Sequence, residues 1–101
     1  MAQTLIWTNE ALDDIDRIAE YISKDSPFHA QIVVERLFDL AAELPAHPKL
    51  GRIVPELQVV NVRERFLYSY RLIYELTDHT IHVLAVIHGK RLLESVERFS
   101  R

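Results

Sequence analysis

Apolar and polar positions repeat with two different periods in this chain, and the period changes near its middle. Residues 4–8 (TLIWT) are apolar or β-branched, which is typical of a short strand. The apolar positions then become 11, 12, 15, 18, 19 and 22, which is one face of an α-helix. Thr8 or Asn9 can cap this helix, and acidic residues follow in its first turns. The pattern predicts a strand and then a helix that ends near Lys24.

A second helix is predicted after a very short turn. Ser26-Pro27 combines a capping residue with a proline at the first helical position. The helical period continues through residues 30–44, and Pro45 and Pro48 stop it. Because short connections make neighbouring helices antiparallel, we expect a helical hairpin. Residues 45–58 are the loop-like stretch of the chain.

The second half of the chain carries strand patterns. Residues 59–66, 69–77 and 80–88 are predicted as three strands, and residues 90–99 as a last short helix. The order β-α-α-β-β-β-α indicates an α+β fold, with an N-terminal helical hairpin packed on one face of a small, mostly antiparallel sheet. A length of 101 residues predicts a single domain over residues 1–101.

Asp78-His79 separates the last two predicted strands, and a two-residue turn there would set their register. Residue 71 would then lie opposite residue 86, and side chains would alternate between two faces. The nearly all-apolar face should lie on the helices, and the other face would bring Arg71 diagonal to His88. We expect a partner-binding site at this end of the sheet, formed by Arg63, Arg65, Arg71, Ile73, Leu84, Val86, His88, Lys90 and Arg91.

Composition and charge narrow the classes of function. The net charge of −3 argues against a grip on a nucleic-acid backbone, so we expect no direct specific DNA binding. The C-terminal half is the more cationic half and would attract an acidic partner. Cysteine is absent and the five histidines lack ligand spacing, so we expect no metal and no cofactor. No signal peptide and no membrane-length apolar run is found, so we expect a cytoplasmic protein without membrane contact.

Four stretches together resemble the ParE/RelE superfamily, the toxins of bacterial type II toxin–antitoxin systems. WTNEALDDIDRIAEYI is similar to the first helix of that family, and HPKLGRIVPEL is similar to a loop of its ParE branch. VRERFLYSYRLIYEL, which contains Tyr70, Arg71 and Tyr74, is similar to the central strands. VLAVIHGKR is similar to the last strand. In this order, the stretches cover nearly the whole chain.

The resemblance implies one of two activities. RelE-like members are ribosome-dependent mRNA endonucleases, whereas ParE-like members bind and poison DNA gyrase. Arg71 and Arg91 match two arginines of the RelE pattern, but Glu97 stands where that pattern has a tyrosine. The acidic net charge and the VRE and HPxLGR elements favour the ParE branch. We therefore expect a gyrase inhibitor that is neutralised by a cognate antitoxin, with no residue assigned to catalysis.

Two alternatives stay open. The first is a RelE-like mRNA interferase, in which Arg71 and Arg91 would stabilise charge on the phosphate and His88 would move a proton. The second is an inactive toxin fold that only binds antitoxin. Single residues also have purely structural interpretations. Arg71 can be a rim arginine paired with Glu64 or Glu75, and His88 can be a strand-end histidine bonded to backbone.

Overall fold

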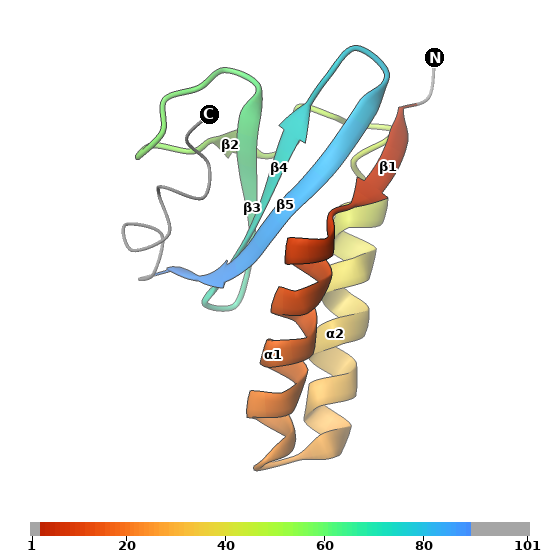
Figure 1. The fold of residues 1–101 in the computed structure, drawn as a ribbon, viewed down its shortest axis with the longest axis vertical. Coiled ribbons are helices and arrows are strands. Elements are labelled where there is room, and N and C mark those ends of the chain that lie inside the picture. Colours follow the sequence, from red (N-terminus) through yellow and green to blue (C-terminus); the bar gives the residue numbers. More distant parts are fainter. Residues whose placement is uncertain (1–2, 90–101) are drawn as a thin grey trace.

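The computed structural model describes residues 3–89 as a sheet covered on one side by two antiparallel helices (Figure 1). The helices are α1 (Asn9–Ser23) and α2 (Pro27–Ala42). The strands are β1 (Thr4–Trp7), β2 (Arg52–Ile53), β3 (Val62–Leu67), β4 (Tyr70–Leu76) and β5 (Thr80–His88). The predicted α+β class is confirmed, and the helix predicted at residues 90–99 lies outside the described residues.

Both helices begin at the predicted caps. The Thr8 hydroxyl accepts a hydrogen bond from the Ala11 N–H at 3.2 Å and donates one to the Val83 carbonyl at 2.7 Å. The Ser26 hydroxyl accepts from the His29 N–H at 3.1 Å, and a proline follows at the first position of α2. Thr8 therefore starts α1 and also fastens its first turn to β5. Further along, the helical hairpin extends beyond the end of the sheet (Figure 1).

The sheet has the strand order β1-β5-β4-β3-β2. The edge strand β1 pairs parallel to β5, and the other neighbouring pairs are antiparallel, as expected for a mostly antiparallel sheet. Strand β2 was not predicted, because two residues are too few to show a period. Residues 59–61, which were predicted to begin a strand, belong to the loop before β3. No helix within residues 3–89 is long and apolar enough to span a membrane.

The predicted register of β4 and β5 is correct near their turn and wrong beyond it. Glu75 lies opposite His82 as expected, but the register shifts by one residue between Tyr74 and Ile73. Strand β5 contains one extra residue there, Leu84, which is the pattern of a β-bulge. Because side chains alternate along a strand, the extra residue moves every later side chain of β5 to the opposite face.

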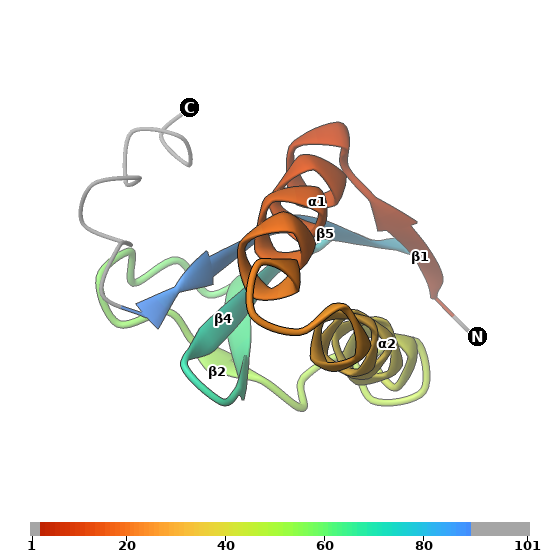
Figure 2. The same ribbon diagram turned by 90° about the horizontal axis from the view of Figure 1, so that it is seen from below.

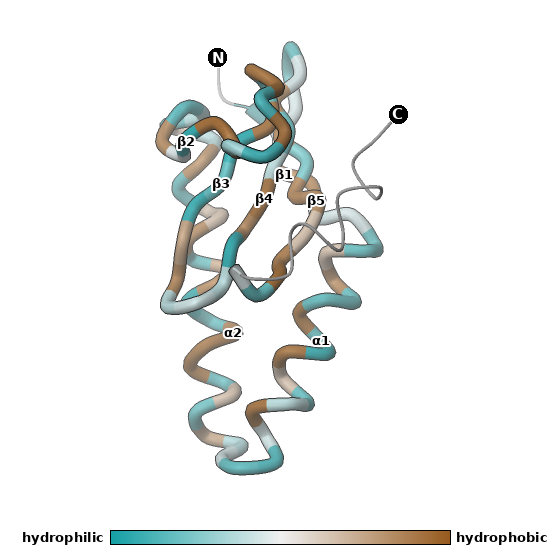
Figure 3. The backbone as a smooth tube through the Cα atoms, turned by 90° about the vertical axis from the view of Figure 1, so that its left-hand side faces the viewer, coloured by the Kyte–Doolittle hydropathy of each residue, from teal (hydrophilic) through white to brown (hydrophobic). Residues whose placement is uncertain are grey.

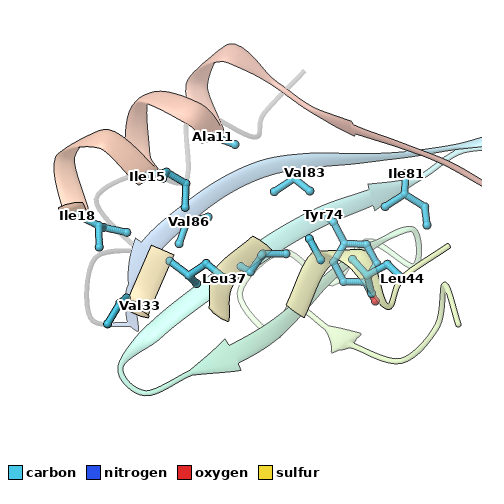
Figure 4. Close-up of a cluster of buried hydrophobic side chains, with 12 residues drawn as sticks. Ala11, Ile15, Ile18, Val33, Leu37, Leu44, Tyr74, Ile81, Val83 and Val86 are labelled. Carbon is cyan, nitrogen blue, oxygen red and sulfur yellow. The ribbon is translucent and has the colours of Figure 1, made fainter. Parts of the chain in front are cut away.

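Two hydrophobic cores result, one on each face of the sheet. The larger core lies between the helices and the sheet, and Figure 4 shows Val83 and Val86 of β5 within it. The smaller core lies on the other face. It consists of Val54, Val62, Ile73, Ala85 and Ile87, with Leu57 and Leu84 packed against it. Residues 54–61 supply part of this second core. In Figure 3, the sheet lies in front of the helices, so the face of the sheet that carries this core is turned to the viewer.

Candidate functional site

Arg71 is held at the centre of a charged cluster on the face of the sheet opposite the helices. Its side chain is only 5% exposed. The guanidinium donates to both oxygens of Glu56, with Nη1 at 2.7 Å from Oε2 and Nη2 at 2.9 Å from Oε1. Its Nε also donates to Oε1 of Glu64 at 2.6 Å, and Nη2 makes a further contact with the same oxygen. A fork that meets two planar carboxylates is the strongest kind of side-chain ion pair.

Two further side chains complete this cluster, which we call the Arg71 network (Arg52, Glu56, Glu64, Phe66 and Arg71). The Nε of Arg52 donates to Oε2 of Glu64 at 2.6 Å, so the buried Glu64 joins two arginines. The Phe66 ring has the guanidinium carbons of Arg52 and Arg71 at 5.0 and 5.8 Å from its centre. Two cations and two anions balance, so the buried charges of Arg71 and Glu64 are both paired.

Hydrogen bonds within the network shift the pKa values of Arg71 and Glu56 away from neutral pH. Hydrogen bonding to Glu56, more than to Glu64, raises the pKa of Arg71 above its ordinary value against the opposing effect of burial. The hydrogen bonds from Arg71 hold the pKa of Glu56 below its ordinary value. A carboxylate and a guanidinium in this state stay charged and pair as ions. They are not proton donors or acceptors for a reaction.

Within residues 3–89, Arg63 and Arg65 do not converge with Arg71 as predicted. Arg63 and Arg65 lie on the helix side of β3, where they bind other parts of the chain. Arg63 donates to the Gly51 carbonyl at 3.0 Å. Arg65 donates to the Leu40 carbonyl at 3.1 Å near the end of α2 and pairs with the carboxylate of Glu43 at 3.3 Å. The two arginines therefore link α2 and the following loop to the sheet. The prediction that they converge with Arg71 is wrong.

The predicted proximity of Arg71 and His88 is also wrong. His88 lies opposite Tyr70 in the register, and the two rings meet edge to face with centres 6.2 Å apart. Arg71 lies opposite Ile87 instead. Because Tyr70 and Arg71 are consecutive in β4, their side chains are on opposite faces. His88 is thus an exposed residue on the helix side of the sheet, and it lies there because of the register shift at Leu84.

The apolar surface predicted for a partner is largely buried in the protein itself. Ile73 has no exposed area, because Val54 and Leu57 from the preceding loop cover it. Val86 is buried on the helix side, and Leu84 is half-buried. Ile73 and Val86 therefore cannot contact a partner in this structure. Lys90 and Arg91 lie outside the described residues.

The sequence reasoning identified some members of the network and missed others. The pairing of Arg71 with Glu64 is confirmed, although Arg71 is buried and not at the rim. Arg52 and Glu56 were missed, because both are single charges in a loop-like stretch without a period. Within residues 3–89, no group of three metal-ligating side chains converges.

Comparisons with known proteins agree with this fold. Residues 5–93 match the sequence family described as the ParE toxin of the type II toxin–antitoxin system parDE. "Toxin RelE2" of Caulobacter vibrioides is 34% identical over 93 residues, which cover 91% of this chain and 100% of that protein. "Putative toxin Y4kP" of Sinorhizobium fredii is 34% identical over 86 residues, which cover 82% of this chain and 84% of that protein.

Solved structures that share this fold include one of a toxin–antitoxin system and one of a toxin. The chromosomal ParDE toxin–antitoxin system from P. aeruginosa contains a chain that matches with a TM-score of 0.72 and 22% identity, covering 86% of this chain and 96% of that chain. A mutant of the E. coli toxin RelE in the free state matches with a TM-score of 0.65 and 22% identity, covering 99% of this chain and 93% of that chain. At such identities the likeness shows the fold alone.

Proposed function

The chain belongs to the ParE/RelE superfamily of toxins of type II toxin–antitoxin systems, and we propose that it acts as a ParE-like toxin that inhibits DNA gyrase by binding it. The observation that supports binding over mRNA cleavage is the state of Arg71. Its guanidinium already holds two carboxylates, and its side chain is buried. Because Nη1 also donates to the Gly89 carbonyl at 3.4 Å, all five N–H donors of Arg71 are used, and none is left for a phosphate that is being cut.

The position of His88 supports the same proposal. A nuclease of the RelE-like kind would need Arg71 and His88 beside one phosphate, because proton transfer and charge stabilisation must act on the same group. The two side chains lie on opposite faces of the sheet. In addition, Glu56 and Glu64 neutralise Arg52 and Arg71, so the network has no net positive charge that would attract an RNA backbone.

We also infer that a cognate antitoxin neutralises this toxin. A ParDE system from P. aeruginosa and a RelBE2 toxin–antitoxin complex from Mycobacterium tuberculosis are among the solved relatives. Exposed aromatic side chains offer contact area on this chain: Tyr21 and Phe28 near the tip of the helical hairpin, and Tyr68 in the turn between β3 and β4. Aromatic residues contribute much of the energy at protein interfaces, so these three are the first positions to test for antitoxin binding.

One observation favours the alternative, a RelE-like mRNA interferase. The Caulobacter relative, which is aligned over 91% of this chain, carries the name RelE2. Two assays on the purified full-length protein separate the mechanisms. We expect inhibition of gyrase supercoiling and no cleavage of mRNA on ribosomes. Cleavage that is lost in His88→Ala, together with unaffected supercoiling, would establish the interferase and refute our proposal.

A growth experiment tests whether the toxin is active at all. Induced expression without antitoxin should stop bacterial growth if the chain is a functional toxin, and co-expression of the antitoxin should restore growth. Normal growth with normal amounts of folded protein would instead favour the inactive, antitoxin-binding module.

A further inference from the structure

The two carboxylates that bind Arg71 are attached to the protein in different ways. Glu64 belongs to β3, which has a paired strand on each side, and its side chain has no exposed area. Glu56 belongs to residues 54–61, which connect β2 to β3, and its side chain is 27% exposed. Of the two partners, Glu56 is therefore the outer one and the one that can leave without dismantling the sheet.

The loop of residues 54–61 has local hydrogen bonds that do not tie its middle to the sheet. Leu57 and Gln58 donate their N–H groups back to the Val54 carbonyl, at 3.2 and 3.0 Å. Gln58 has a φ of 51°, a left-handed conformation that a residue with a side chain adopts at a cost. Two side-chain contacts hold this middle part in place: Leu57 packs on the second core, and Glu56 pairs with Arg71.

The charge that remains without Glu56 indicates what could take its place. Arg52 and Arg71 carry two positive charges and Glu64 carries one negative charge, so the remainder is +1. A monoanion balances that charge and a dianionic phosphate does not. The two N–H groups that point at Glu56 are spaced for the two oxygens of a planar carboxylate. The ring of Phe66, which is 48% exposed, forms one wall beside them.

We propose that the Arg71 fork is a carboxylate-binding site, that Glu56 is its internal occupant, and that an acidic side chain of a partner protein can replace Glu56. The loop is then a plug that fills the site in the free protein. It also shows what a replacing segment should contain, because Glu56 is followed directly by Leu57, whose side chain enters the second core. An acidic residue followed by a large aliphatic residue would reproduce both contacts. This inference holds for either target of the toxin.

Removing the internal carboxylate and supplying a free one tests the site. We would measure the melting temperature of full-length Glu56→Ala by circular dichroism at pH 8.5, where phosphate is dianionic and acetate monoanionic, in sodium acetate, chloride and phosphate of equal ionic strength. If acetate binds the vacated fork with a Kd on the order of 10 mM, about 100 mM acetate should raise the melting temperature by roughly 5–10 °C over chloride. The wild type, whose fork is filled, should differ by less than about 1 °C between the two salts.

Glu43→Ala is the matched control. It also removes a carboxylate from an arginine, but Arg65 keeps its bond to the Leu40 carbonyl and Glu43 is more than half exposed. We expect no acetate effect for this variant. An equal response of Glu56→Ala to all three salts, or a larger response to phosphate than to acetate, would overturn the proposal. If Glu56→Ala is unfolded in chloride, recovery of its helical signal in acetate is the same readout, and no recovery also overturns it.

Discussion

Asp14 in α1 is expected to hold the β-bulge of β5 in place. Its side chain is almost entirely buried, and Oδ2 accepts a hydrogen bond from the Val86 N–H at 2.9 Å. Val86 follows the extra residue Leu84 by two positions, where the ladder with β4 has already shifted. Oδ1 also accepts from Arg17 at 3.2 Å, one turn further along the helix. Replacing Asp14 with alanine removes both bonds and leaves the Val86 N–H buried without this acceptor.

The expected cost follows from these contacts. A hydrogen bond to a charged group contributes about 1.5–3 kcal/mol, and an unsatisfied buried donor costs a similar amount. The ion pair with Arg17 adds at most a few tenths, because the Arg17 side chain is 73% exposed. Alanine favours the helix over aspartate by roughly 0.5 kcal/mol. Asp14→Ala should therefore lower the free energy of unfolding by roughly 2 kcal/mol.

Asp13→Ala is the matched control, because Asp13 is exposed in the same helix and the substitution brings the same gain in helix propensity. Urea unfolding should shift the midpoint of Asp14→Ala below that of Asp13→Ala by roughly 1 M, with an unchanged slope. Asp14→Asn keeps an acceptor oxygen and should lose roughly half as much stability. Hydrogen exchange at the Val86 amide should become faster only in the Asp14 variants. Equal midpoints for Asp14→Ala and Asp13→Ala would refute this role.

Three other predictions concern the loop and the Arg71 network. A Cβ added at Gly51 would lie 2.5 Å from a backbone oxygen of β3, so Gly51→Ala should lower the free energy of unfolding in urea by roughly 2–3 kcal/mol. Gly89→Ala is the control, because the nearest atom to its added Cβ is at 3.4 Å, and it should lower this free energy by less than about 1 kcal/mol. The buried Tyr74 hydroxyl accepts a hydrogen bond from the Gly51 N–H and donates one to the Pro48 carbonyl, both at 2.9 Å. Tyr74→Phe should therefore lower the free energy of unfolding by roughly 2 kcal/mol. A loss below about 0.5 kcal/mol would contradict the two bonds. Arg71 lowers the pKa of Glu56 from its ordinary value of 4.5. The stability that this pair contributes is therefore complete above pH 4.5 and is lost as the pH falls through the lowered pKa. Glu56→Gln should flatten that part of the stability–pH curve, and an unchanged curve would argue against the pair.

The helices and the strand near the turn could be predicted because their signals are local. Thr8 and Ser26-Pro27 cap the helices through residues three positions away, and the apolar period states which side of each helix is buried. The two-residue turn at Asp78-His79 set the first part of the β4–β5 register for the same reason. The family resemblance, which is confirmed, came from the order of these local elements along nearly the whole chain.

The candidate site could be predicted only in part, because its members meet through tertiary contacts. Arg71 stood out as a charge within an apolar strand, and Glu64 was one of the two carboxylates considered as its structural partner. Glu56 is separated from Arg71 by fifteen positions and lies in an irregular loop. No period indicates that this loop folds back over the sheet and turns a predicted partner surface into a second core.

The sequence by itself determined the two helices and the strands other than β2 within residues 3–89, since each depends on residues within a few positions of one another. The tertiary structure decided which face each side chain of β5 occupies. From Val83 to Ile87 the strand is apolar at every position, so both faces are equally hydrophobic and either register would satisfy the pattern. A carboxylate in α1, seventy-two positions away, accepts the Val86 N–H at the bulge, and we expect this bond to favour the observed register. That contact exists only in the folded chain, in which the bulge places His88 and Arg71 on opposite faces.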